Sequence, residues 1–377
     1  MRICYISTYP PTECGIATYT KYLSDEIKNL KKEVVILSQI GAQGENVFPI
    51  YYPNDKDIAY KLFHLVSKLT PDIIHIQHEF GLFGMERGIQ IVDFLLRCKI
   101  ANVPVITTLH TVFKAPGSTE KIITEKILEY STEIIVHENH QKEYLIETYQ
   151  INKKIHVIPH GVRKVNKVKN AKEKLNLSEN KVVLLAGYFR TTKHFEKLLH
   201  IFPEILKKYQ KVTLLIACRL RILEHNELRD QLLKSFKYSE ANGQIKILRG
   251  QFPQYTFDTI MSAADVVVLP YSAGAQSGML AQFSAFKIPT VTSDLLSFKL
   301  WNESSKGGLS SFSDLDYINN ILKIISDDEL AQKMRDNISK NNEQRYWDVI
   351  SKKHLKIYQN IVETNKEISE FYYIPEN

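Results

Sequence analysis

Two positively charged side chains follow a strand-and-glycine pattern near the middle of the chain. The apolar run 182–185 indicates a buried strand, and Gly187 comes just after it. Arg190 and Lys193 then precede an apolar helical pattern over 198–205. An arginine fork, a lysine charge and the positive end of a helix can all face one anion. The pattern therefore predicts a diphosphate site, with an ordinary turn carrying two solvated cations as the alternative.

Histidines stand at the ends of three further apolar runs that indicate strands. They are His78, with Glu79 next to it, His110 and His160. A histidine beside a glutamate suits a general base, a clamp for sugar hydroxyls or a packed polar pair, and the sequence leaves these open. No second histidine follows at the spacing of a helical zinc site, so we expect no metal. His137, which follows another strand, is interpreted as structural.

Two loops rich in small residues precede helices and expose backbone amides. Gly15 lies in a proline-stiffened loop after the first strand. Gln276, Ser277 and Gly278 follow an apolar strand, and Gln282 comes one turn into the next helix. Because amides at a helix N-terminus bind anions, we expect both loops to contact the phosphates or the ribose of a ligand.

Short apolar runs alternate with helical patterns, which is typical of α/β proteins built on parallel sheets. In the first half, strands are expected at 2–7, 33–37, 73–77, 105–109, 133–136 and 155–158. In the second half they are expected at 181–186, 213–217, 245–248, 266–269 and 290–292. Two doubly wound, Rossmann-like domains are therefore predicted, with ligands at the carboxyl ends of the strands.

The segment 163–181 is rich in lysine and asparagine and weakly patterned, which favours a domain boundary. We place an N-terminal domain at 1–163 and a second domain at 164–345, with a terminal helix and a tail at 346–377.

The composition fits a two-domain protein, with 377 residues of which 44% are hydrophobic and 24% charged. No apolar stretch approaches the ~20 residues of a membrane-spanning helix. Four widely separated cysteines favour reduced thiols, and we expect a cytoplasmic protein. The net charge of +7 fits anionic small molecules or an anionic membrane surface and is too weak to indicate nucleic acid.

Taken in order, these motifs resemble those of the group 1 glycosyltransferases, a retaining family whose GT-B fold has two Rossmann-like domains. The resemblance runs nearly end to end. It is carried by Tyr-Pro-Pro-x-x-Cys-Gly-Ile-Ala at 9–17, Gln-His-Glu-Phe-Gly at 77–81, Thr-Leu-His at 108–110, Ile-Pro-His-Gly at 158–161, Gly-Tyr-Phe-Arg-Thr-Thr-Lys at 187–193, Ala-Asp-Val-Val-Val-Leu-Pro-Tyr at 264–271 and the terminal helix from Trp347 to Tyr358.

The resemblance implies a role for each motif. Arg190 and Lys193 would neutralise the diphosphate of a sugar donor as the glycosidic bond breaks, and Gly15 would approach the same phosphates. His110 would hold hydroxyls of the donor sugar. The acceptor side would be formed by His78, Glu79 and His160. The donor would be a UDP- or GDP-linked sugar that serves as co-substrate, with no separate cofactor. The resemblance also implies that the domain at 1–163 is the acceptor-side domain, that the domain at 164–345 is the donor domain and that the terminal helix returns to the first.

The donor loop departs from the family pattern. Where the family has two glutamates eight positions apart, this chain has Gly274 and Gln282, and Lys287 replaces the usual glycine before Ile-Pro. A glutamine can still bond to a ribose diol, but it is neutral and it also donates. Gln276 and the amides that follow it would compensate for the missing first glutamate. A second departure is His194, where a glycine usually follows the lysine.

The sequence thus favours transfer of a hexose from a nucleoside-diphosphate sugar to a hydroxyl of a glycan, a lipid-linked or a small-molecule acceptor, with retention and without a metal. The alternatives are a non-catalytic partner subunit that binds a sugar nucleotide, and an epimerase or a phosphorylase of the same fold. Lysines at 28–32 and 207–211 suggest peripheral contact with the inner face of an anionic membrane, although a solvated helix face is the more common meaning of such runs.

Overall fold

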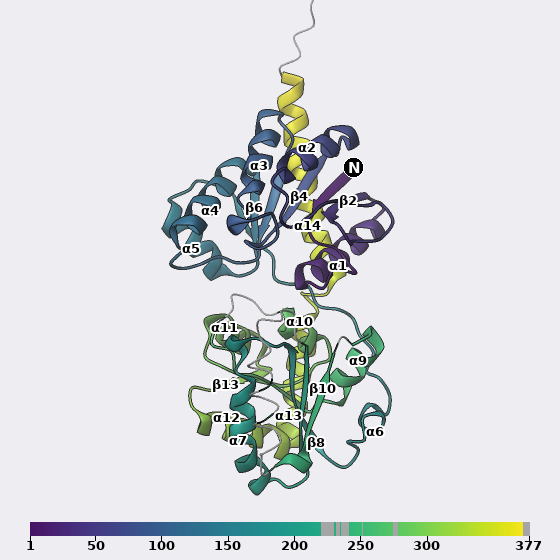
Figure 1. Ribbon diagram of the computed structural model, residues 1–377, viewed down its shortest axis with the longest axis vertical. Helices are drawn as coiled ribbons and strands as arrows, with labels where there is room; N and C mark the ends of the chain where they lie inside the picture. Colours follow the sequence, from purple (N-terminus) through teal and green to yellow (C-terminus); the bar gives the residue numbers. More distant parts are fainter. Residues whose placement is uncertain (220–229, 231–233, 235–240, 251, 274–277, 372–377) are drawn as a thin grey trace, which may run out of the picture. The chain divides into compact units, whose positions relative to one another are not determined.

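The computed structural model describes residues 1–219, 230, 234, 241–250, 252–273 and 278–371 (Figure 1). The chain divides into two compact units, which are described separately. Unit 1 comprises Met1–Gly161 together with Arg345–Asn377, and unit 2 comprises Val162–Gln344. The boundaries expected from the sequence, after 163 and after 345, lie within two residues of these divisions. The predicted site residues Gln276 and Ser277, and the departure at Gly274, lie outside the described residues.

Unit 1 is built on a seven-stranded parallel sheet in the order β3-β2-β1-β4-β5-β6-β7. Its strands are β1 (Arg2–Ile6), β2 (Glu33–Gln39), β3 (Val47–Tyr51), β4 (Ile73–His78), β5 (Val105–Leu109), β6 (Glu133–Val136) and β7 (Ile155–Val157). Its helices are α1 (Gly15–Asn29), α2 (Ile58–Leu69), α3 (Gln90–Ile100), α4 (Ser118–Tyr130), α5 (Asn139–Tyr149) and α14 (Trp347–Phe371), with a 3₁₀ turn at Glu86–Gly88.

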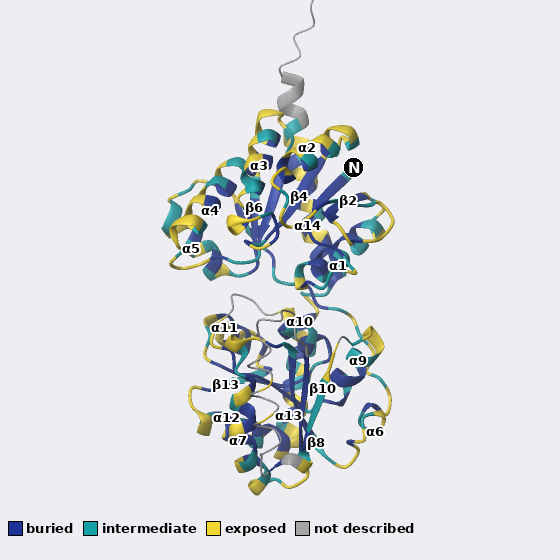
Figure 2. Ribbon diagram, in the orientation of Figure 1, coloured by how far each residue is buried: buried dark blue, intermediate teal, exposed yellow. Residues whose placement is uncertain are grey.

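The strands of unit 1 are apolar on both sides because helices cover both faces of the sheet (Figure 2). Cys4 and Ile6 of β1 face a core shared with α2, α3 and α4. Ile3 and Tyr5, which alternate with them, face a second core shared with α1 and α14. The terminal helix α14 therefore belongs to unit 1, where it packs against α1.

Unit 2 has a six-stranded sheet in the order β10-β9-β8-β11-β12-β13, again parallel throughout. Its strands are β8 (Lys181–Tyr188), β9 (Val212–Arg219), β10 (Ile245–Arg249), β11 (Val266–Leu269), β12 (Thr290–Thr292) and β13 (Gly308–Ser310). Its described helices are α6 (Ala171–Lys174), α7 (Phe195–Lys208), α9 (Gln254–Ala263), α10 (Gly278–Ala285), α11 (Leu296–Ser305), α12 (Asp314–Ser326) and α13 (Asp328–Asn342), with 3₁₀ turns at Thr191–Lys193 and Asn242–Gln244.

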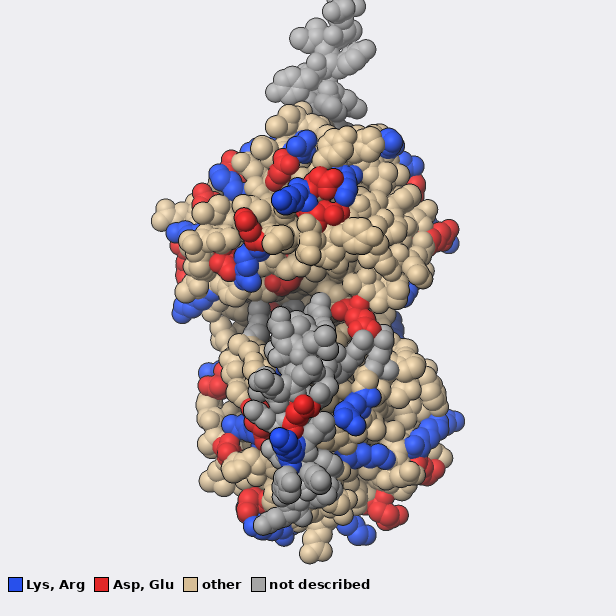
Figure 3. All heavy atoms as spheres, viewed as in Figure 1, with Lys and Arg blue, Asp and Glu red and all other residues tan. Residues whose placement is uncertain are grey.

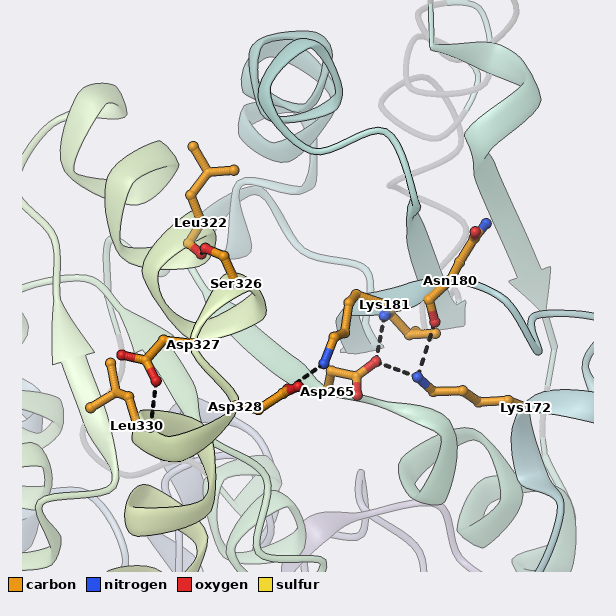
Figure 4. A network of polar contacts seen from close by, with 10 residues as sticks. Lys172, Asn180, Lys181, Asp265, Leu322, Ser326, Asp327, Asp328 and Leu330 are labelled. Carbon is orange, nitrogen blue, oxygen red and sulfur yellow. Dashed lines mark hydrogen bonds and ion pairs between the residues drawn. The ribbon is translucent and has the colours of Figure 1, made fainter.

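A network of carboxylates and lysines fixes the start of β8, the strand that leads to the predicted diphosphate site (Figure 4). Asp265 accepts hydrogen bonds from the backbone N–H of Val182 and from Lys172 Nζ, both at 2.7 Å. Lys181 Nζ donates to Asp328 Oδ1 at the start of α13, at 2.6 Å. These bonds anchor the amino end of β8.

The chain leaves unit 1 after Gly161 and returns to it at Arg345. Within unit 1, Gly161 lies in close contact with Trp347, two residues after the point of return. A Cβ on Gly161 would lie 2.3 Å from Cδ2 of Trp347, a distance that side chains do not tolerate. Trp347 is buried, and its ring meets Tyr19 of α1 edge-on, with 4.9 Å between ring centroids. The glycine is therefore required by the close approach of an aromatic ring.

Gly161→Ala should destabilise unit 1 by about 1–3 kcal/mol, because the added methyl group overlaps the indole ring. Gly81→Ala is the matched control, since a Cβ there meets nothing within 4 Å. Urea unfolding monitored by Trp347 fluorescence, in a Trp301→Phe background, measures the difference. Equal midpoints for the two variants would contradict this packing.

Candidate active site

The predicted diphosphate site lies at the carboxyl end of the central strand β8. The strand continues further than the sequence pattern indicated, through Gly187 to Tyr188, so the turn comes at Arg190 and not at the glycine. Gly187 has φ +133°, a backbone conformation that other residues rarely adopt. The 3₁₀ turn Thr191–Lys193 then leads into α7. A hydrogen bond from Ser272 N to Thr192 O, at 2.9 Å, ties this turn to the loop after β11.

Lys193 is held close to the backbone of β8. A Cβ on Gly187 would lie 2.7 Å from Lys193 Nζ, so the glycine makes room for the ammonium group. The same Nζ lies 5.1 Å from the centroid of the Tyr271 ring. Burial, and to a lesser extent the positive charge of Arg190, lower the pKa of Lys193 to about 8. An anion bound here would offset both causes of that shift.

The two cations differ from their neighbours in what they contact. His194 pairs with Glu196 at 2.9 Å, and Lys197 pairs with Asp314 at 2.9 Å. Within the part of the chain that the structure describes, no carboxylate pairs with Arg190 or Lys193. Their positive charge is thus left available for a ligand, next to the first turn of α7.

The predicted ribose contact, Gln282, lies on α10, whose first residue is Gly278. Arg163 Nε donates to Gln282 Oε1 at 3.1 Å, and Arg163 Nη2 donates to Asp258 Oδ1 at 2.8 Å. The guanidinium group also lies over the Phe286 ring, 5.8 Å from its centroid. Arg163 therefore fixes the amide of Gln282 with its oxygen occupied, and the NH₂ group remains as a donor.

In unit 1, Gly15 is the exposed first residue of α1. The N-cap residue, Cys14, makes no side-chain hydrogen bond to the helix, and a Cβ on Gly15 would meet nothing within 4 Å. The first turn of this 15-residue helix is therefore open to an anion.

His110 is half-buried at the end of β5, and both of its ring nitrogens already have protein partners. Nε2 lies 2.8 Å from Gln77 Oε1, and Nδ1 lies 3.3 Å from His137 Nε2. The ring also meets Tyr19 of α1 edge-on, at 4.9 Å between centroids. Burial and the neighbouring histidines hold the pKa of His110 well below its usual range, so the ring is neutral at pH 7.

The three residues expected on the acceptor side are placed differently from one another. His78 is fully buried between the Phe80 and Phe83 rings, with no hydrogen-bond partner for its nitrogens among the described residues. Glu79 is half-buried and accepts hydrogen bonds from Phe80 N at 3.0 Å and Thr111 Oγ1 at 2.6 Å.

His160 lies on the Trp347 side of Tyr19, and its Nδ1 contacts Gly161 O at 2.8 Å. Glu79 is the one carboxylate of the three residues, and its side chain is only partly buried.

Several contacts around these sites are not predicted by the sequence. His137, which is interpreted as structural from the sequence, bonds directly through its ring to His110. Gln77 and Tyr19 contact the same ring, and Arg163 holds Gln282. His137 could have been found by the signal that found His110, because both follow parallel strands. The contact of Arg163 with Gln282 joins positions 119 residues apart, and no local pattern reveals it.

Among the described residues, no group of three or more histidine, cysteine or acidic side chains could hold a metal ion. No helix of the described chain is long and apolar enough to cross a membrane. On the face shown in Figure 3, basic and acidic side chains are mixed on unit 1, and several basic side chains lie near one another on the right of unit 2. Lys207, one of the lysines that suggested membrane contact, pairs with Glu204 at 2.7 Å.

Two family models match the chain, one over each half. Residues 14–164 match the family model Glycosyltransferase Family 4, and residues 166–345 match the model Glycosyl transferases group 1. No curated protein sequence matches the chain.

Solved structures share the fold at low sequence identity. Sucrose-phosphate synthase from Thermosynechococcus elongatus is 17% identical, with a TM-score of 0.78, over 97% of this chain and 100% of that one. HepE from Anabaena, in complex with UDP and glucose, is 14% identical, with a TM-score of 0.75, over 96% and 100%. A glycosyltransferase from Rickettsia africae is 17% identical, with a TM-score of 0.73, over 96% and 98%.

Two parallel-sheet α/β units and these structural matches define a GT-B fold. The two family models together span residues 14–164 and 166–345. The chain belongs to the group 1 glycosyltransferases.

Buried imidazoles should make unit 1 sensitive to acid. His75, His78, His137 and His354 are fully buried, and desolvation lowers the pKa of each, to about 3 for His78 and about 4 for His137 and His354. Below pH 6.5 the unfolded chain therefore binds more protons than the folded one. The free energy of unfolding of unit 1 decreases as the pH is lowered from 6.5 to about 4. Each histidine contributes about 1.4 kcal/mol per pH unit in that window.

Acid titration followed by Trp347 fluorescence should show cooperative unfolding of unit 1 between about pH 6 and 4, because four such groups together rival the stability of a typical domain. His354→Leu is the informative variant, since Nε2 of His354 has no partner among the described residues. This change should move the midpoint to lower pH. A midpoint below pH 3 in the unmodified protein would contradict the prediction.

Lys193 should titrate near pH 8, well below an ordinary lysine. Dimethylation with ¹³C-formaldehyde allows its pKa to be read from methyl chemical shifts, with Lys193→Arg used to assign the signal. Arg190→Met should raise this pKa without restoring the ordinary value, because burial is the larger cause. Titration of Lys193 above pH 10 would contradict the described burial.

Proposed function

We propose that the protein transfers a hexose from a nucleoside-diphosphate sugar to an acceptor hydroxyl, with retention at the anomeric carbon and without a metal ion. The observation that carries the proposal is the pair Arg190 and Lys193. Both lie at the carboxyl end of the central strand of unit 2, beside the start of α7, and neither has a carboxylate partner among the described residues.

The two cations would act on the leaving group. As the bond between the anomeric carbon and the phosphate oxygen breaks, negative charge develops on the diphosphate. Fixed positive charges stabilise that charge more than they stabilise the bound donor, and this difference lowers the barrier. Arg190 supplies a planar fork and Lys193 a point charge, which together take the part that a divalent cation has in other enzymes.

Retention would follow from attack on the same face of the sugar as the departing group. The acceptor oxygen forms its bond to the anomeric carbon as the bond to the phosphate oxygen breaks, and that phosphate oxygen takes the acceptor proton. This route requires no protein nucleophile. It is supported by the family assignment and by the leaving-group cations.

Further residues of unit 2 are assigned to donor recognition. Gln282 would bond to the ribose through the NH₂ group that Arg163 leaves available. Unit 1 separately offers two groups of matching chemistry, because the open first turn of α1 at Gly15 suits a phosphate and His110 suits a sugar hydroxyl. HepE from Anabaena has been solved with UDP-glucose, which makes UDP-sugars the first donors to test, followed by GDP-sugars.

Lys193→Ala should reduce turnover by about 10²–10³-fold, the range typical of losing one group that stabilises transition-state charge. The assay measures nucleoside diphosphate released from candidate UDP- and GDP-sugars in the presence of an acceptor mixture. Near-normal turnover in this variant would remove Lys193 from the mechanism.

Lys197→Ala is the matched control, because Lys197 is one turn further along and its charge is already paired with Asp314. That variant should keep turnover within about threefold of the unmodified protein, as expected for an exposed ion pair. Binding of UDP with no release from any donor would instead favour a non-catalytic sugar-nucleotide binder.

A further inference from the structure

A continuous row of polar side chains crosses the sheet of unit 1 in the order of its strands. It begins at Tyr358 of α14, continues through His75 and Gln77 of β4, and reaches His110 after β5 and His137 after β6. It ends at the carbonyl of Ile158, after β7. The successive distances are 2.5 Å from Tyr358 Oη to His75 Nδ1, 3.1 Å from His75 Nε2 to Gln77, 2.8 Å from Gln77 to His110 Nε2, 3.3 Å from His110 Nδ1 to His137 Nε2 and 2.9 Å from His137 Nδ1 to Ile158 O.

The last bond of the row fixes the proton on His137. A carbonyl oxygen can only accept, so the hydrogen must lie on Nδ1 of His137. His137 is 2% exposed, and burial lowers its pKa to about 4, so the ring is neutral at pH 7 and its Nε2 carries a lone pair. The facing atom, Nδ1 of His110, must therefore donate.

The proton on Nδ1 of His110 in turn determines which atom of Gln77 faces the ring. A neutral His110 with its proton on Nδ1 has only a lone pair at Nε2, so Gln77 must present a donor there. An amide turned by a half-rotation places its nitrogen where its oxygen was. The amide of Gln77 then donates to His110 and shares the proton on Nε2 of His75 with Thr108 Oγ1, which lies 2.7 Å from that nitrogen. His75 in turn accepts at Nδ1 from Tyr358 Oη, and every bond of the row has one donor and one acceptor.

We propose that His137 and Gln77 are positioning residues that hold His110 in the tautomer protonated on Nδ1. His110 thereby presents an obligatory acceptor at Nε2. In the free protein the donor at that atom is the amide of Gln77. With a sugar bound, it is a hydroxyl group, which must donate its hydrogen to His110. This last step rests on the proposed function, whereas the tautomer itself does not.

The tautomer can be measured directly in the resting protein. Long-range ¹H–¹⁵N correlation spectra of protein labelled with ¹⁵N-histidine distinguish a protonated ring nitrogen from one with a lone pair. His110→Gln and His137→Leu identify the two sets of signals by their disappearance. At pH 7.5 we expect Nδ1 protonated and Nε2 unprotonated in both rings. A His110 protonated on Nε2 would overturn the proposal.

Two variants test what holds the tautomer. His137→Leu removes the acceptor at Nδ1, and His110 should then move its proton to Nε2. In Gln77→Glu, an ionised carboxylate at Nε2 would only accept and His110 should then bind a second proton, whereas a protonated carboxyl would donate to Nε2; in both cases Nδ1 of His110 keeps its proton at pH 7.5. If His137→Leu does not fold, Gln77→Glu decides alone. A His110 protonated on Nε2 alone in folded Gln77→Glu, or an unchanged tautomer in folded His137→Leu, would overturn the proposal.

His354→Leu is the matched control. His354 is also fully buried, its ring lies 5.7 Å from that of His75, and its Nδ1 bonds only to Ile350 O of its own helix. This variant should leave the ¹⁵N shifts of His110 unchanged, and a switch of the His110 tautomer in it would overturn the proposal.

Once a donor is known, His137→Leu should lower kcat/KM at least tenfold, and His354→Leu should change it less than threefold. Equal effects would overturn the functional step. Absence of any transfer activity, with the spectra as expected, would overturn the proposed function and leave the tautomer assignment intact.

Discussion

The cost of removing a charge from water governs the protonation states of the predicted site residues in each unit. In unit 1, five histidines lie around Tyr19, Tyr358 and Trp347, and their environment keeps the imidazoles neutral and bonded or packed against one another. In unit 2, Lys193 is half-buried beside Arg190 without a carboxylate partner among the described residues, and its pKa falls to about 8. Unit 1 thus keeps its buried imidazoles neutral, whereas unit 2 keeps a cation whose desolvation an anionic ligand would compensate.

The parallel sheets place the predicted site residues of each unit at the carboxyl ends of its strands. Each predicted site residue that is described lies at or just beyond the carboxyl end of a strand, or in the helix that follows it. The network of Asp265, Lys172 and Lys181 fixes the amino end of β8, and Tyr358 ties α14 to His75 on β4. The supporting contacts lie on rigid elements, whereas Arg190 and Lys193 lie in the short turn that those elements hold.

Much of this arrangement could be predicted from the sequence, because buried parallel strands appear as apolar runs. The expected strands at 105–109, 133–136, 266–269 and 290–292 have the observed bounds. Two strands were missed. Strand β3 contains Pro49 and β13 has only three residues, and both lie at sheet edges, where the apolar signal is weakest. The partners of His110 and Gln282 could not be predicted, because His137 and Arg163 reach them only through the tertiary fold.

Proton uptake on nucleotide binding tests the central role of Lys193 most directly. At pH 8.5 an ammonium group with a pKa near 8 is mostly deprotonated in the free protein, and a bound diphosphate raises that pKa. Titration calorimetry of UDP and GDP in buffers of different ionisation enthalpy should show uptake of roughly half a proton or more. Lys193→Met should abolish that uptake and weaken binding at least tenfold. Binding with equal affinity and no linked proton in both proteins would contradict the account.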